Sequence, residues 1–279
     1  MILIHNQTVV KGLWIPCLAL SLLACTTSAP AGVMLSFKGT PGSFPGSGDT
    51  SVIVSDPSTV PAVVTIDVDG AGIPSIFSVT SPNPPVTDLW TVSGVASGGF
   101  NSRVVLTLTG EGINGPQQVR QRHPEGIGVR GSGGNSGRID AEVGDDPDEA
   151  INIHFDATDA GLAGLQLSLV SVGVVDANNQ GEFIPDIGIT DFDGVLRVIP
   201  DYGDGDDIPD IFPVPSPAAL IGGSMGQVSF SQPDPAPQGE GENGYRLASI
   251  EFDVVPEPSS FLLLAIAGAL LAQHWRRHS

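Results

Sequence analysis

The sequence predicts an all-β protein whose body is an antiparallel, jelly-roll-like β-sandwich. Short apolar runs alternate residue by residue with polar side chains, which is the pattern of strands that bury one face. Glycine and proline, 36 and 24 of the 279 residues, separate these runs throughout the chain, as they do where turns join strands. Hydrophobic residues make up 41% of the chain, enough for a core, and no stretch of the body has the periodicity of a long helix.

The first 31 residues are expected to be a signal peptide for the Sec translocon. Lys11 is their only charged residue, and residues 13–24 form an apolar run of the usual length. Cleavage after Ala31 is favoured because the other end of the chain supplies a membrane anchor. The alternatives are a lipobox that ends at Cys25, which would then be acylated, and an uncleaved N-terminal anchor. After cleavage at Ala31 no cysteine remains, which excludes disulfides and Cys-ligated zinc.

The body is expected between residues 32 and 254, as one large sandwich or as two smaller ones that share an interface. About a dozen strands are expected in it, from the number of short alternating runs between turn residues. Two proline-rich stretches, residues 209–217 and 232–244, are expected to be long surface loops. The clearest alternation predicts strands at residues 64–68, 104–108, 151–155 and 250–254.

The excess of acidic over basic residues bears on whether the protein binds nucleic acid. The chain has 31 Asp and Glu against 11 Lys and Arg, which gives a formal net charge of −20. A field of this sign repels phosphate backbones, so no nucleic-acid partner is expected.

Two short motifs are interpreted as coincidental, and no catalytic set is expected. Residues 222–226 match G-x-S-x-G, but a nucleophile elbow needs a helix after the serine, and residues 227–230 are predicted to be a strand. Residues 126–131 match G-x-G-x-x-G with no helix to follow, so a turn is expected there. His154 is expected on the solvated face of its strand, beside Asn152 and Asp156. The chain is therefore predicted not to be an enzyme.

Calcium is the one cofactor that the sequence suggests. Residues 140–210 contain 18 Asp or Glu and a single Arg. Ca²⁺ binds six to eight oxygen ligands in flexible loops, and the glycines of residues 201–210 permit such a loop. A second loop, residues 176–181, has Ile187 where an EF-hand needs glutamate. The alternative is that these loops only keep a secreted protein soluble. The candidate ligands are Asp201, Asp204, Asp206, Asp207 and Asp210.

The C-terminal residues 255–279 form a separate segment. Pro256 and Pro258 cannot continue a central strand or a helix, so the chain around Glu257 is expected to be extended and exposed. A helix over residues 260–275 would be about 25 Å long, the lower limit for crossing a membrane. Arg276 and Arg277 would then hold the C-terminus in the cytoplasm.

The order of these features resembles the PEP-CTERM sorting signal of exopolysaccharide-producing Gram-negative bacteria. The resemblance rests on Pro256-Glu257-Pro258, the short apolar helix and Arg276-Arg277. The same segment is also catalogued as an ice-binding protein C-terminal domain, a label that implies no ice binding. The resemblance implies that an exosortase recognises the Pro-Glu-Pro residues and removes the helix. The protein would be anchored transiently in the inner membrane and would end at the cell surface or outside the cell.

A looser resemblance extends into the body. Residues 126–129, 139–140 and 149–155, and the closing run 245–250, are similar to segments of PEP-CTERM proteins. The bodies of those proteins are thought to be β-sandwiches, and no biochemical activity comes with the resemblance.

These observations lead to three hypotheses of function. The first is an exported, non-enzymatic cell-surface or extracellular-matrix protein. The second is a Ca²⁺-stabilised carbohydrate-binding or adhesion module associated with exopolysaccharide. In it Trp90 and Phe100 would stack on sugars, although packing in the core is the favoured interpretation of both rings. The third is a secreted polysaccharide hydrolase, for which carboxylate pairs in so acidic a chain carry little information.

Overall fold

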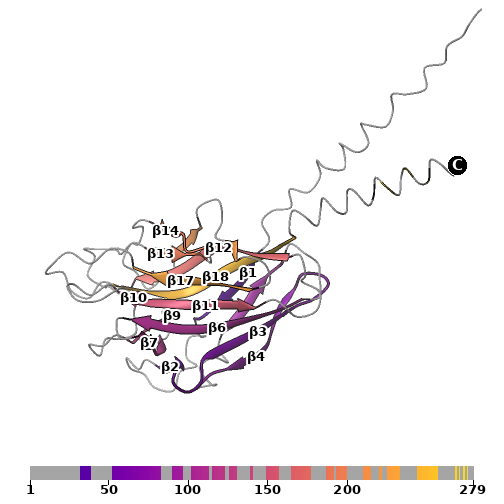
Figure 1. Ribbon diagram of the computed structural model, residues 1–279. Coiled ribbons are helices and arrows are strands. Elements are labelled where there is room, and N and C mark those ends of the chain that lie inside the picture. Colours follow the sequence, from indigo (N-terminus) through magenta and orange to yellow (C-terminus); the bar gives the residue numbers. More distant parts are fainter. Residues whose placement is uncertain are drawn as a thin grey trace, which may run out of the picture. The chain divides into compact units, whose positions relative to one another are not determined.

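The computed structural model confirms the all-β prediction. Every regular element of the described body is a strand, and all the pairings between these strands are antiparallel (Figure 1). In the part of the chain that is described, no helix is long and apolar enough to cross a membrane. The structure describes residues 32–38, 52–82, 90–96, 102–112, 115–122, 126–130, 139–140, 149–156, 165–176, 187–191, 193–199, 210–214, 220–221, 225–232 and 244–256, together with 268, 270, 273 and 275.

The strands form two sheets, one of ten strands and one of eight. The path of the ten-stranded sheet is β15-β12-β18-β9-β8-β2, and β1, β5, β10 and β16 pair beside it. Its strands are β1 (Val33–Ser36), β2 (Val52–Ser55), β5 (Thr91–Gly94), β8 (Val119–Arg122), β9 (Gly126–Val129), β10 (Ile139–Asp140), β12 (Leu165–Asp176), β15 (Asp210–Pro213), β16 (Leu220–Ile221) and β18 (Gly244–Pro256).

The eight-stranded sheet has the order β14-β13-β17-β11-β6-β3-β4, and β7 pairs with β6 beside this path. A hairpin therefore lies at each edge, β13 with β14 and β3 with β4. Its strands are β3 (Ala62–Val68), β4 (Pro74–Thr80), β6 (Ser102–Gly112), β7 (Gly115–Gln117), β11 (Ala150–Asp156), β13 (Ile187–Thr190), β14 (Leu196–Ile199) and β17 (Met225–Ser231).

One hydrophobic core takes residues from both sheets. The strands predicted at 64–68, 104–108 and 151–155 are present as β3, β6 and β11, and their apolar positions are buried as the alternation indicated. Phe155 of β11 and Phe252 of β18 meet edge to face across the two sheets, with their ring centroids 5.6 Å apart. The Tyr245 hydroxyl of β18 donates a 2.9 Å hydrogen bond to the Ser231 carbonyl of β17, and burial raises the pKa of this tyrosine well above its usual value.

The last strand of the body, β18, lies inside the ten-stranded sheet. It pairs with β12 along one side and with β10, β9 and β1 in turn along the other, and residues 244–250 are all buried. It ends at Pro256, two residues beyond the predicted end of the body, so the expectation that Pro256 lies outside the strand is wrong. Among the described residues only β12 pairs with β18 beyond Phe252, and proline is tolerated where one side of a strand has no ladder.

Two further segments differ from the sequence-based prediction. Part of the expected loop at 209–217 is the strand β15, which pairs with β12 at the sheet edge, where a proline costs no central ladder bond. The expected turn at 126–131 begins with the strand β9, which lies between β8 and β18. Gly126 has φ +131°, and a Cβ there would clash with the Leu247 carbonyl oxygen, so close approach of β18 explains this glycine.

Candidate functional site

Most residues of the predicted metal and sorting sites lie outside the described part of the chain. Of the calcium candidates, only Asp210 is described, as the first residue of β15, opposite Val174 of β12. Of the sorting residues, only Pro256 is described, at the end of β18. No three His, Cys, Asp or Glu side chains of the described residues are close enough to hold a metal. The predicted residues outside the described part are Asp201, Asp204, Asp206, Asp207, Glu257, Pro258, Arg276, Arg277 and the whole of residues 1–31.

Trp90 is a core residue and not a surface platform for sugars. Its side chain is 3% exposed and packs edge to face on Phe37, with ring centroids 5.1 Å apart. Its Nε1 donates a 2.7 Å hydrogen bond to Oε1 of the buried Gln121, whose Nε2 donates to the Phe37 carbonyl at 2.5 Å. The favoured interpretation of Trp90 as a core residue is therefore confirmed and the alternative stacking role is wrong, whereas Phe100, the other ring, lies outside the described residues.

The G-x-S-x-G match does not form a nucleophile elbow. The strand β17 starts at Met225, inside the motif, so a strand takes the place of the helix that the elbow requires. The predicted strand at 227–230 is thereby confirmed.

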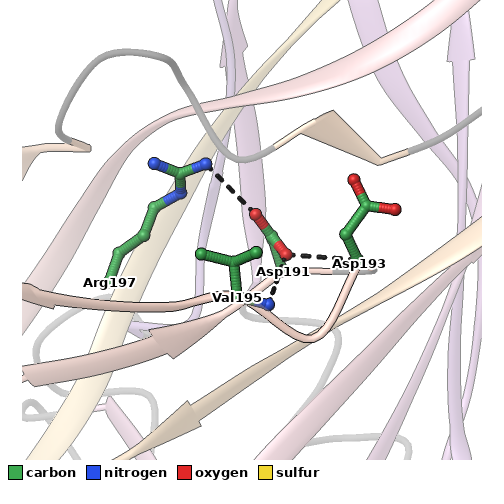
Figure 2. A network of polar contacts seen from close by, with 4 residues as sticks. All are labelled: Asp191, Asp193, Val195 and Arg197. Atoms are coloured by element: carbon green, nitrogen blue, oxygen red, sulfur yellow. Dashed lines mark hydrogen bonds and ion pairs between the residues drawn. The ribbon is translucent and has the colours of Figure 1, made fainter.

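Asp191, which is 6% exposed, lies in the turn between β13 and β14 (Figure 2). Its Oδ1 accepts hydrogen bonds from the backbone N–H groups of Asp193 at 3.1 Å and Val195 at 2.9 Å. Its Oδ2 accepts a 3.2 Å bond from Nη2 of Arg197. Gly194 takes φ +75° and donates its N–H to the Asp191 carbonyl at 2.9 Å. The carboxylate therefore fixes a chain reversal.

The same arrangement recurs at the other edge of the sheet. Asp69, between β3 and β4, accepts bonds at Oδ1 from the N–H groups of Ala71 and Ile73, both at 2.9 Å, and Gly72 has φ +81°. Asp56, between β2 and β3, accepts from the backbone and the hydroxyl of Ser58. Both hydrogen bonds lower the pKa of Asp56, and the bond from the Ser58 hydroxyl has the larger effect. Sequence reasoning missed this use of aspartate, although an Asp with Gly three residues later marks two of the turns.

A set of polar side chains lies on the outer face of the eight-stranded sheet, over its three central strands β6, β11 and β17. Because Val104, Leu106 and Leu108 point into the core, the residues between them point outward, as do their partners on β11 and β17. We call this surface the polar face. It consists of Thr107, Thr109, Glu111, Asn152, His154, Gln227 and Ser229.

The register places the members of the polar face in rows across three central strands. Asn152 of β11 lies between Thr109 of β6 and Ser229 of β17, and the next row is Thr107, His154 and Gln227. Opposed side chains in such rows have Cβ atoms about 5 Å apart. Nδ2 of Asn152 donates a 2.9 Å hydrogen bond to Glu111 Oε2, and the Ser229 hydroxyl donates to Asn152 Oδ1.

Asn152 is consequently held in one orientation and is only 8% exposed, although it belongs to the outer face. The prediction that His154 faces away from the core beside Asn152 and Asp156 agrees with their positions on β11.

An aromatic ring and an ion pair lie on the same outer face, toward its β4 edge. Phe77 is the extra residue of a β-bulge in β4 and is 61% exposed. The guanidinium carbon of Arg103 lies 4.1 Å from the centroid of the Phe77 ring. Arg103 also donates from Nε and Nη2 to the two carboxylate oxygens of Asp67, at 2.6 and 2.9 Å. These hydrogen bonds lower the pKa of Asp67.

No protein-family model, no curated protein and no solved structure matches this chain.

Proposed function

We propose that this chain is an exported, non-enzymatic protein of the cell surface or extracellular matrix. In this proposal residues 1–31 are a signal peptide for the Sec translocon, and residues 260–275 hold the chain transiently in the inner membrane. An exosortase then recognises Pro256, Glu257 and Pro258 and removes the helix. The body is a jelly-roll-like β-sandwich, and the two antiparallel sheets with a common core support that assignment.

The observation that carries the proposal is the order of features at the C-terminus. A Pro-Glu-Pro triplet, a short apolar run and Arg276-Arg277 follow one another in the last 24 residues. The position of β18 is compatible with removal of this segment, because the strand ends at Pro256 and the described core needs no residue beyond it. Cleavage after the strand would therefore release an intact body.

Four of the described carboxylates have structural roles, which supports a structural body. Asp56, Asp69 and Asp191 fix chain reversals, and Asp67 forms an ion pair with Arg103.

The proposal is tested by replacing Pro256, Glu257 and Pro258 with alanine in the host. Antibodies against the body and against a tag after Ser279 then follow both parts of the chain through cell fractionation. The variant should stay full-length in the inner membrane. The wild type should lose the tag and be released from the membrane. Pro233, Asp234 and Pro235 repeat the same chemistry within the body, and their replacement by alanine is the matched control. A Pro256-Glu257-Pro258 variant that is shortened and exported normally contradicts the proposal.

A second candidate function is a carbohydrate-binding or adhesion module that contacts exopolysaccharide and is stabilised by Ca²⁺. The polar face favours the binding role, and the acidic residues 201–210 favour the ion. If Asp204 and Asp206 are ligands, Ca²⁺ should raise the melting temperature of the full chain in detergent more than Mg²⁺ does. The double variant Asp204→Ala and Asp206→Ala should lose this difference, and the charge-matched control Asp145→Ala and Asp146→Ala should keep it. Equal shifts from the two ions exclude the site.

A further inference from the structure

We propose that the polar face of the eight-stranded sheet, together with Phe77 at its edge, binds an uncharged polysaccharide chain. The inference deepens the second candidate function, on which it rests, by naming the surface and the charge class of the ligand. It requires no Ca²⁺, because every residue from which it is argued belongs to β3, β4, β6, β11 or β17. It stands or falls independently of whether an exosortase recognises the tail.

The chemistry of the face matches a neutral polymer of hydroxyl groups. Thr107, Thr109 and Gln227 present hydroxyl and amide groups, which both donate and accept hydrogen bonds, and the Ser229 hydroxyl, which donates to the nearly buried Asn152, can still accept one. A sugar hydroxyl does the same, so either partner can take either role. Each row of side chains is in register across adjacent strands, and the rows repeat along the strands about every 7 Å.

The charge distribution of the protein favours a neutral polysaccharide over an acidic one. The chain has a net charge of −20, and on this face the carboxylates Asp67, Glu111 and Asp156 outnumber the guanidinium of Arg103. Asp67 and Arg103 neutralise each other, and Glu111 and Asp156 lie near opposite ends of the β6–β11 ladder. An acidic polysaccharide would meet repulsion from the whole protein without a cationic row on this face to offset it. A neutral chain meets no such barrier.

Phe77 supplies an aromatic platform that is fixed before any ligand arrives. The β-bulge aims its side chain to the outer face, where Arg103 covers the ring at 4.1 Å from the centroid. Asp67 holds Arg103 by two hydrogen bonds, so the ring is supported by a clamped guanidinium. A ring that is 61% exposed can pack against the apolar C–H groups of a sugar.

The polar groups are also held in place. Asn152 is fixed by Glu111 and Ser229, and its burial to 8% exposure restricts its rotamers. A preorganised surface loses less side-chain entropy on binding, which favours the weak, repeated contacts of a polymer ligand.

The test is affinity electrophoresis of the full chain in a non-glycosidic detergent. Hydroxyethylcellulose, laminarin and dextran are the neutral probes, and alginate is the acidic one. Phe77 and Gln227 are exposed, so Phe77→Ala and Gln227→Ala leave the core intact. The matched control is Ile211→Ala, which removes an apolar side chain that is 56% exposed on β15 of the other sheet.

At least one neutral polymer should retard the wild type and the Ile211→Ala control equally, and addition of EDTA should not change this. Phe77→Ala should raise the dissociation constant about tenfold, and Gln227→Ala by a smaller factor. Three outcomes overturn the inference: no retardation by any neutral polymer, retardation by alginate alone, or unchanged binding in Phe77→Ala. Light scattering tests a fourth outcome that would overturn it. If the protein is a dimer and Phe77→Ala dissociates it, this face is a contact between two copies of the chain.

Discussion

Gln121 is a fully buried polar side chain, and two hydrogen bonds account for its presence in the core. It accepts from Trp90 Nε1 and donates to the Phe37 carbonyl, and so joins β8 to two aromatic residues that pack on each other. The sequence favoured the core for Trp90 but left a sugar platform as the alternative, because an indole ring suits both a core and a binding surface. The partner that decides between them is 31 residues away in the chain.

Replacement of Gln121 by alanine should lower the free energy of unfolding by roughly 2–4 kcal/mol, since it leaves both an indole N–H and a carbonyl buried without a partner. Gln227→Ala is the control, because Gln227 is exposed, and its cost should be within about 0.5 kcal/mol. Denaturant unfolding followed by tryptophan fluorescence measures both. Equal midpoints for the two variants would show that these hydrogen bonds contribute nothing net.

At the scale of single elements, alternation decided which strands could be predicted. β3, β6, β11 and residues 250–254 of β18 have an apolar residue at every second position, and each was predicted in place. β9 and β15 were missed because their glycine and proline residues usually mark turns. In β9 the close approach of β18 requires glycine, and in β15 the position at the sheet edge tolerates proline.

The polar face was predicted only through His154 and its neighbours on one strand. Its other members come from β6 and β17, and only the register of the sheet brings them beside β11. A single sequence contains the alternation of each strand but not which strands are adjacent.

The two edge hairpins of the eight-stranded sheet, β3–β4 and β13–β14, have the same type of aspartate-containing turn in different surroundings, so their glycines can be compared directly. Gly194 and Gly72 both have positive φ in an Asp-headed turn, but only Gly72 has a close neighbour. A Cβ atom added to Gly72 would lie 2.6 Å from the Ala96 carbonyl oxygen. Gly194→Ala should therefore cost only the backbone strain, about 1 kcal/mol, whereas Gly72→Ala should cost roughly 2–4 kcal/mol.

Asparagine tolerates positive φ, so Gly194→Asn should retain most of the stability while Gly72→Asn should not. Thermal unfolding of the four variants measures these differences. Equal losses at the two positions would mean that the contact with Ala96 is relieved by a small shift of the backbone.

At the scale of the whole molecule, the last strand in the sequence lies inside its larger sheet. The ten-stranded sheet is complete only when β18 has paired with β12 on one side and with β1, β9 and β10 on the other. These partners come from residues 33 to 176, so the contacts span much of the chain. Non-local pairing of this kind is slow to form, and the core stays incomplete until the residues of β18 have joined the sheet.

The dependence on β18 predicts a sharp boundary for truncation. A chain that ends at Pro256 should unfold cooperatively with nearly the midpoint of the full chain, because no described core residue follows β18. A chain that ends at residue 243 loses Tyr245, Leu247, Ile250 and Phe252, all of which are at most 1% exposed, and should show no cooperative transition. Circular dichroism during heating distinguishes these outcomes.

A third chain, ending at Phe252, separates burial from strand length. It keeps all four of those core side chains but loses the residues that pair with β12 alone. It should therefore fold with a lower midpoint than the chain that ends at Pro256. A cooperative transition in the chain that ends at residue 243 would mean that β12 and its other neighbours complete the sheet without β18. Folding of the body would then not depend on arrival of its last strand.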